Sequence, residues 1–169
     1  MGKTTLLRSV LAEVTGVQHV VGSAVLRQLA GEEFDRFDHL PPARKHEYRV
    51  AAIEFMADLQ RDRQEHLLCD GHTALLDEST GEVGGVFTDS DCRFFKELIL
   101  MEAPADVVLD RRRGDASKRR SLDPAVVRLE VEAERAMATK VAARWGMKLH
   151  RLPLDPAAAT VALKEVLSC

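Results

Sequence analysis

Apolar residues recur every three to four positions along several stretches of the chain, which is the spacing of a helix that buries one face. The longest stripes predict helices with clear ends, because Gly16 suits a helix C-terminus and Asp123 followed by Pro124 suits a helix N-terminus. The helices predicted in this way cover about 6–14, 23–29, 43–65, 124–145 and 155–169, with one more helix beginning after Pro104.

Short apolar runs separate these helices and predict strands. The runs are VQHVV (17–21), HLLCD (66–70), LILME (98–102) and MKLHRLPL (147–154). Strands that alternate with helices predict an α/β fold with a parallel, doubly wound sheet. Two stretches do not fit this alternation. Residues 31–42 are polar and end in two prolines, so we expect a loop with at most one helical turn, and residues 74–90 are rich in turn residues and predict an excursion outside the main sheet.

Composition narrows the class of protein. The 169 residues, of which 46% are hydrophobic and 30% charged, suit a single globular domain spanning 1–169. A net charge of -3 gives no overall field that would gather nucleic acid or an anionic membrane surface, so we expect neither as a partner. The three cysteines lack zinc or C-x-x-C spacing, and no run has membrane-spanning length or the form of a signal peptide. We therefore expect a cytoplasmic protein.

The opening MGKTTLL contains the second half of a phosphate-binding loop, whose full form G-x-x-x-x-G-K-[ST] follows a strand and opens a helix. In such a loop Gly2 lets the backbone approach phosphate, Lys3 reaches the β and γ oxygens, and the Thr4 hydroxyl ligates Mg²⁺, with Thr5 beside them. The alternative is a helix N-terminus that reads GKTT by accident. The loop's first half and its strand would precede Met1, so we expect the gene product to begin upstream.

Asp70 ends the predicted strand 66–70, at the edge of the sheet where doubly wound proteins bind ligands. An acidic partner for Mg²⁺ belongs at this place in phosphate-loop enzymes. Two alternatives stay open: Asp70 is a turn-former before Gly71, and His72 is either a polar loop residue or a catalytic base.

Six basic residues lie within ten positions between Arg111 and Arg120, and two aspartates, Asp110 and Asp115, offset only part of this charge. Cationic side chains of this kind stabilise the charge that spreads over phosphoryl oxygens during transfer. A nucleic-acid patch is the alternative, but the segment lacks interleaved aromatic residues.

Taken in order, GKTT, GSAVLRQLA, HLLCDGHTAL and LILMEAPADVVLDRRRGDASKRRSLD resemble the nucleoside monophosphate kinases of the phosphate-loop superfamily, in particular the archaeal-type adenylate kinases. The resemblance implies a three-layer P-loop NTPase fold with a parallel sheet of order 2-3-1-4-5, whose central first strand is missing from this chain. The strands at 66–70 and 98–102 would flank that gap, unless they pair directly or a partner chain donates a strand. The resemblance also implies a short lid over about 111–123 and a homo-oligomer.

The resemblance assigns roles to the candidate residues. ATP and Mg²⁺ are the implied cofactors, with nucleotide bound by Gly2, Lys3, Thr4 and Thr5 and the metal by Thr4 and Asp70. Lys3, Arg112 and Arg120 would stabilise the transferred group, while Arg27, Gly71 and His72 would bind a small-molecule acceptor. The sequence departs from bacterial adenylate kinases, which carry an arginine shortly after the aspartate matched by Asp70.

The activity that follows is transfer of the γ-phosphoryl group of ATP·Mg to a small acceptor, most readily a nucleoside monophosphate. Two alternatives remain from the residues themselves. One is a non-catalytic ATP-binding regulator, and the other is a small-molecule kinase that acts on a hydroxyl and uses His72 or Asp70 as a base.

Overall fold

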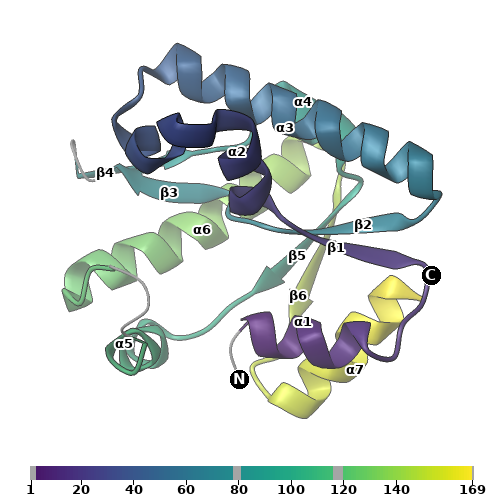
Figure 1. The fold of residues 1–169 in the computed structure, drawn as a ribbon. Helices are drawn as coiled ribbons and strands as arrows, with labels where there is room; N and C mark the ends of the chain where they lie inside the picture. The colour runs from purple at the N-terminus through teal and green to yellow at the C-terminus, as the bar shows by residue number, and fades with distance from the viewer. Residues whose placement is uncertain (1–2, 78–80, 116–119, 169) are drawn as a thin grey trace.

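The computed structural model describes residues 3–77, 81–115 and 120–168 (Figure 1). Met1 and Gly2, two of the residues of the predicted loop, lie outside the described residues, as do residues 116–119 of the basic segment. The helices are α1 (Lys3–Leu11), α2 (Gly22–Ala30), η1 (Gly31–His39), α3 (Pro42–Arg63), α4 (Asp89–Phe94), α5 (Ala105–Arg113), α6 (Pro124–Trp145) and α7 (Pro156–Leu167). The strands are β1 (Val17–Val21), β2 (His66–Asp70), β3 (Ala74–Asp77), β4 (Glu82–Gly85), β5 (Glu97–Met101) and β6 (Lys148–Leu152).

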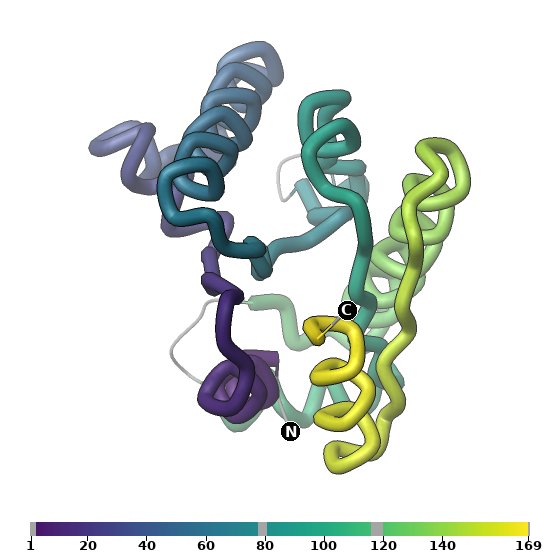
Figure 2. Tube along the Cα trace, turned by 90° about the vertical axis from the view of Figure 1, so that its right-hand side faces the viewer, coloured from purple at the N-terminus to yellow at the C-terminus, as the bar shows by residue number. Residues whose placement is uncertain are grey.

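The strands form two parallel pairs and one antiparallel pair. β1 pairs with β2, from Val17 opposite His66 to Val21 opposite Asp70, and β5 pairs with β6 in the same parallel sense. In the described part of the chain no hydrogen-bonded ladder joins β2 to β5, so these strands do not pair directly (Figure 2). The α/β class with parallel strands is confirmed, while the order across the two pairs is not fixed by hydrogen bonds.

Helices cover the strands on both sides (Figure 1). α1 and α7 lie together on one side, where Leu6, Val10 and Leu163 are fully or almost fully buried. Half-buried Leu68 of β2 and Ile99 of β5 both pack on this cluster, so α1 and α7 connect the two parallel pairs through apolar contacts. On the other side α2 and α3 cover β1 and β2, with Met56 at 3% exposure.

α6 begins and ends where the sequence predicts. The Asp123 side chain accepts a hydrogen bond from the Ala125 backbone N–H at 2.8 Å, and Pro124 occupies the first helical position. Gly146 ends the helix with a φ of 65°, a left-handed conformation that glycine adopts without strain. α6 packs on β5, β6 and the β3–β4 hairpin, which places it close to the carboxyl end of β2.

Two segments differ in detail from expectation. Residues 31–39 form a 3₁₀ helix, interrupted at Arg36, where a loop with at most one turn was predicted. Phe34 and Phe37 lie on either side of this interruption, and their ring centroids lie 5.8 Å apart, an aromatic contact that the polar pattern of the segment does not predict. Residues 74–90 contain the antiparallel β3–β4 hairpin, which lies outside both parallel pairs as predicted.

Candidate functional site

The first residue of α1 and the last residue of β2 meet. Lys3 forms an ion pair with the Asp70 carboxylate, and its ammonium group donates a hydrogen bond to the Gly71 carbonyl oxygen at 3.1 Å. The Lys3 side chain is 36% exposed and that of Asp70 is 14% exposed. Packing explains the meeting, since the buried face of α1 rests beside Leu68, two residues before Asp70. The fold therefore brings together a cation and an acid that are distant in sequence.

This arrangement suits a phosphorylated ligand. Lys3, Thr4 and Thr5 lie at the N-terminus of α1, where backbone N–H groups without helical partners favour anions. Phosphate oxygens at this position would compete with Asp70 for the Lys3 ammonium group. Asp70 would then be available to a cation.

The donors present fit Mg²⁺ that arrives with a nucleotide. Among the described residues no group of three or more His, Cys, Asp or Glu side chains is placed to hold a metal ion. Mg²⁺ does not need such a cage, because it keeps several waters and takes one or two protein oxygens together with phosphate. Asp70 and the exposed Thr4 are hard oxygen donors of this kind.

The turn after Asp70 is held by a residue that sequence reasoning missed. The two carboxylate oxygens of Glu134, from α6, accept hydrogen bonds from the backbone N–H groups of Thr73 at 2.9 Å and Ala74 at 3.1 Å. His72 Nδ1 lies 3.8 Å from the same carboxylate. Burial raises the pKa of Glu134, but the contacts with His72 and the Thr73 N–H outweigh it and hold this pKa below 4.5.

The position of Glu134 within the apolar pattern of α6 could have indicated a functional or structural role. It lies seven residues after Val127 and seven before Val141, both of which are buried, so an acid interrupts the apolar stripe of α6. An acid at a position of this kind needs partners in the fold.

The arginines predicted to clamp the transferred group are placed differently from each other. Arg112 has a side chain only 12% exposed, pairs with Glu130 of α6 at 2.8 Å, and donates to the Ser121 carbonyl oxygen at 3.1 Å. Arg120 is exposed. No contact recorded for the described residues joins either arginine to Lys3 or Asp70, so their role in phosphoryl transfer stays a prediction.

Arg27, predicted to grip the acceptor, lies in the last turn of α2. Its guanidinium group stacks over the Phe34 ring, 4.3 Å from the centroid, and lies 3.5 Å from the Asp35 carboxylate. The side chain is 64% exposed. An exposed guanidinium group with one loose ion pair can still accept an anionic partner, so the prediction for Arg27 stays open.

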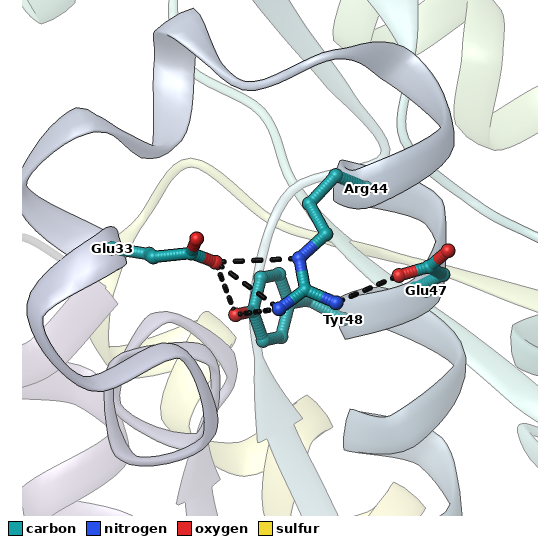
Figure 3. Close-up of polar contacts among 4 residues, drawn as sticks. All are labelled: Glu33, Arg44, Glu47 and Tyr48. Atoms are coloured by element: carbon teal, nitrogen blue, oxygen red, sulfur yellow. Dashed lines mark hydrogen bonds and ion pairs between the residues drawn. The ribbon is translucent and has the colours of Figure 1, made fainter.

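A second arginine in this region is fully engaged (Figure 3). The Arg44 guanidinium group lies between Glu33 of η1 and Glu47 of α3, and donates to the Tyr48 hydroxyl at 2.8 Å. The hydrogen bond that Tyr48 donates to Glu33 lowers the pKa of that carboxyl group. The cluster therefore fastens η1 to α3 and supports Phe34, on which Arg27 stacks.

A small pocket opens one helical turn along α1 from Lys3. It combines apolar walls with one acid and one arginine, and its lining includes Leu6, Met101, Glu102, Arg111, Pro153 and Leu154. Glu102 is itself held by Arg135, whose Nε donates to it at 2.9 Å, and by Arg151.

These features are those expected of a phosphate-loop type of nucleotide site on an α/β fold: Lys3 and Thr4 begin a helix, and Lys3 faces an acid at the end of a parallel strand. A comparison with protein families matches residues 1–127 to the family described as AAA domain. The chain belongs to this family. Membership of this P-loop type of family supports a function in nucleotide binding, with kinase-like or ATPase chemistry. A search of curated proteins found no match.

The match to the AAA domain family ends at Val127, so Glu130 and Glu134 lie beyond it. Within the described ranges, no helix has the length and apolar character needed to cross a membrane.

Proposed function

We propose that this protein is an ATP-dependent phosphotransferase that moves the γ-phosphoryl group of ATP·Mg to a small acceptor, a nucleoside monophosphate in the first instance. The contact of Lys3 with Asp70 and Gly71 is the observation that carries the proposal. Lys3, the proposed phosphate-binding lysine, lies next to Asp70, an acid suited to Mg²⁺, at the carboxyl edge of a parallel strand pair. The family supports nucleotide binding, and the acceptor is our inference from the resemblance.

The residues would divide the work as follows. Lys3 exchanges its present oxygen partners for phosphate oxygens, and the start of α1 contributes backbone N–H groups to the same phosphates. Asp70 and Thr4 would hold Mg²⁺, which offsets phosphate charge when bound.

The acceptor would lie between the Asp70 turn and α2. Arg27 is exposed and is proposed to bind the acceptor's phosphate, with Gly71 and His72 beside it. Arg120, which is exposed, is proposed to approach the transferred group together with Arg112. For Arg112 this requires exchange of Glu130 for a phosphoryl oxygen, because the two groups now form an ion pair.

We also propose one further parallel strand between β2 and β5. This gives the sheet order 2-3-1-4-5, in which β1 and β2 are the second and third strands, the further strand is the first, and β5 and β6 are the fourth and fifth. The supporting observation is that β2 pairs only with β1, and β5 only with β6, in the described part of the chain. A cytoplasmic location and a homo-oligomer stay predictions.

A kinase that acts on a hydroxyl is the second candidate, and one observation favours it. His72 lies 3.8 Å from the Glu134 carboxylate, an arrangement that can orient an imidazole as a base. Acceptors that carry a hydroxyl but no phosphate would then stimulate ADP release.

The test is ADP release with ATP·Mg and a panel of acceptors, on the full chain and on a form extended upstream by an apolar strand and a G-x-x-x sequence. Nucleoside monophosphates should stimulate ADP release, and the extended form should bind ATP more tightly. ATP binding with no acceptor-dependent turnover in either form would contradict the kinase proposal and favour a regulator.

A further inference from the structure

Glu134 makes an unusual set of contacts for a residue on a long surface helix. Its carboxylate accepts hydrogen bonds from two consecutive backbone N–H groups, those of Thr73 and Ala74. The backbone carbonyl oxygen of Glu134 also accepts a hydrogen bond from the Thr73 hydroxyl at 3.3 Å. The Glu134 side chain is 26% exposed and Thr73 is 7% exposed. A hydrogen bond to a charged acceptor in a half-buried setting is stronger than a neutral one.

The residues from Asp70 to Ala74 are therefore fixed by different elements. Lys3 of α1 contacts Asp70 and Gly71, and Glu134 of α6 contacts the three residues that follow. The Val86 N–H donates to the Thr73 carbonyl oxygen at 3.0 Å, which ties the turn to the residue after β4 as well. If Lys3 exchanges its contacts with Asp70 and Gly71 for phosphate oxygens, the hydrogen bonds from Thr73 and Ala74 to Glu134 of α6 remain.

We propose that Glu134 is a positioning residue of the phosphotransfer site, which fixes the turn carrying Asp70 and His72 relative to α1. The inference rests on the proposed function. Its physical basis is that a displacement of about 1 Å in a group that orients reacting atoms can cost about a hundredfold in rate. Glu134 does not touch substrate, and it acts through the backbone of Thr73 and Ala74.

α6 is suited to this role because the same helix face carries Glu130, one turn earlier, which pairs with Arg112. One rigid helix thus contacts both the Asp70 turn, through Glu134, and the start of the arginine-rich segment, through Glu130. Residues at i and i+4 share a helix face, so the two contacts keep a fixed separation.

The experiment compares Glu134→Gln and Glu134→Ala with Glu132→Gln in the full chain and in its upstream-extended form. Glu132 is exposed on the same helix, so the control removes the same charge without the amide contacts. Three readouts are taken: thermal stability, hydrogen exchange at the Thr73 and Ala74 amides, and kcat with the KM for ATP and acceptor.

Glutamine keeps one acceptor oxygen and turns an NH₂ group toward the other N–H. We expect exchange at one or both amides to accelerate about tenfold in Glu134→Gln, and more in Glu134→Ala. We expect kcat to fall about tenfold with the KM for ATP within about twofold of wild type, since the lost interaction orients rather than binds. Glu132→Gln should match wild type in every readout.

A kcat for Glu134→Gln equal to that of Glu132→Gln, in an active wild type, would overturn the inference and leave the proposed function intact. A kcat loss that only follows a loss of folded protein in the melt would also overturn it. If both Glu134 variants fail to fold, hydrogen exchange in the wild type is the deciding measurement. Unprotected Thr73 and Ala74 amides would then refute the hydrogen bonds to Glu134 on which the inference rests. A wild type without acceptor-dependent turnover would refute the proposed function itself, whatever the amides show.

Discussion

The position of Lys3 depends on how α1 is packed, and Val10→Ala tests this packing. Val10 is 0% exposed in the cluster that α1 shares with α7. Val161 lies on α7 and is 57% exposed, so Val161→Ala is the same chemical change on the neighbouring helix in an open setting. The pair of variants isolates the contribution of burial.

The expected magnitude follows from the atoms removed. Valine to alanine deletes the equivalent of two methylene groups, worth about 0.8 kcal/mol each when buried, and a residual cavity adds to the loss. The helix propensity gained by alanine returns about 0.5 kcal/mol in both variants. The net loss in unfolding free energy for Val10→Ala is therefore about 2 kcal/mol, whereas Val161→Ala should stay within about 0.5 kcal/mol of wild type.

Chemical denaturation and thermal melts measure both variants. For a chain of this size about 2 kcal/mol corresponds to a fall in Tm of about 4–8 °C. Equal unfolding free energies for Val10→Ala and Val161→Ala would refute the packing of α1 on α7, and with it the structural reason for the contact between Lys3 and Asp70.

Three further predictions concern single side chains. Arg27→Ala should raise the KM for the acceptor about tenfold or more with little change in the KM for ATP, and the reverse pattern in steady-state kinetics would show that the two sites are inverted. Burial raises the pKa of the Cys69 thiol to about 11 from its ordinary 9.0, so alkylation at pH 8 should be about a hundredfold slower than for an unperturbed thiol, as followed by mass spectrometry. The folded-state pKa of Glu134 lies below 4.5, so its stabilising effect is present above that pH and is lost as the pH falls through the lowered pKa. The stability difference between wild type and Glu134→Gln should therefore shrink in denaturation curves taken at progressively lower pH below 4.5, and a difference that grows in this range would contradict the assignment.

Local patterns were sufficient where an element is defined by its own residues. The period of apolar residues and the Asp123–Pro124 start predicted α6 over the residues at which it is found. The apolar run that ends at Asp70 predicted β2, and the rule that ligands bind at the carboxyl ends of parallel strands predicted where Asp70 would lie. Neither inference needed contacts between distant residues.

Local patterns failed where contacts across the fold decide the outcome. The sequence of η1 is polar enough to suggest a loop, whereas contacts with α3, among them that of Phe37 with the Tyr48 ring, stabilise the helix there. Arg112 stands in a basic run that suggested a clamp on the transferred group, a role that stays a prediction, and nothing in that run indicated its ion pair with Glu130. Charge patterning alone does not reveal a partner on another helix.

The central claim is that the Lys3–Asp70 site transfers the γ-phosphoryl group, and the most direct measurement follows the label from γ-labelled ATP. The full chain and its upstream-extended form are incubated with Mg²⁺ and each nucleoside monophosphate, beside Lys3→Ala as the variant that lacks the phosphate-binding cation. We predict label on a nucleoside monophosphate, reduced by about a hundredfold or more in Lys3→Ala because a charge on the transferring group contributes several kcal/mol. Labelled ATP that binds without passing its label to any acceptor, or transfer that is unchanged in Lys3→Ala, would contradict the account.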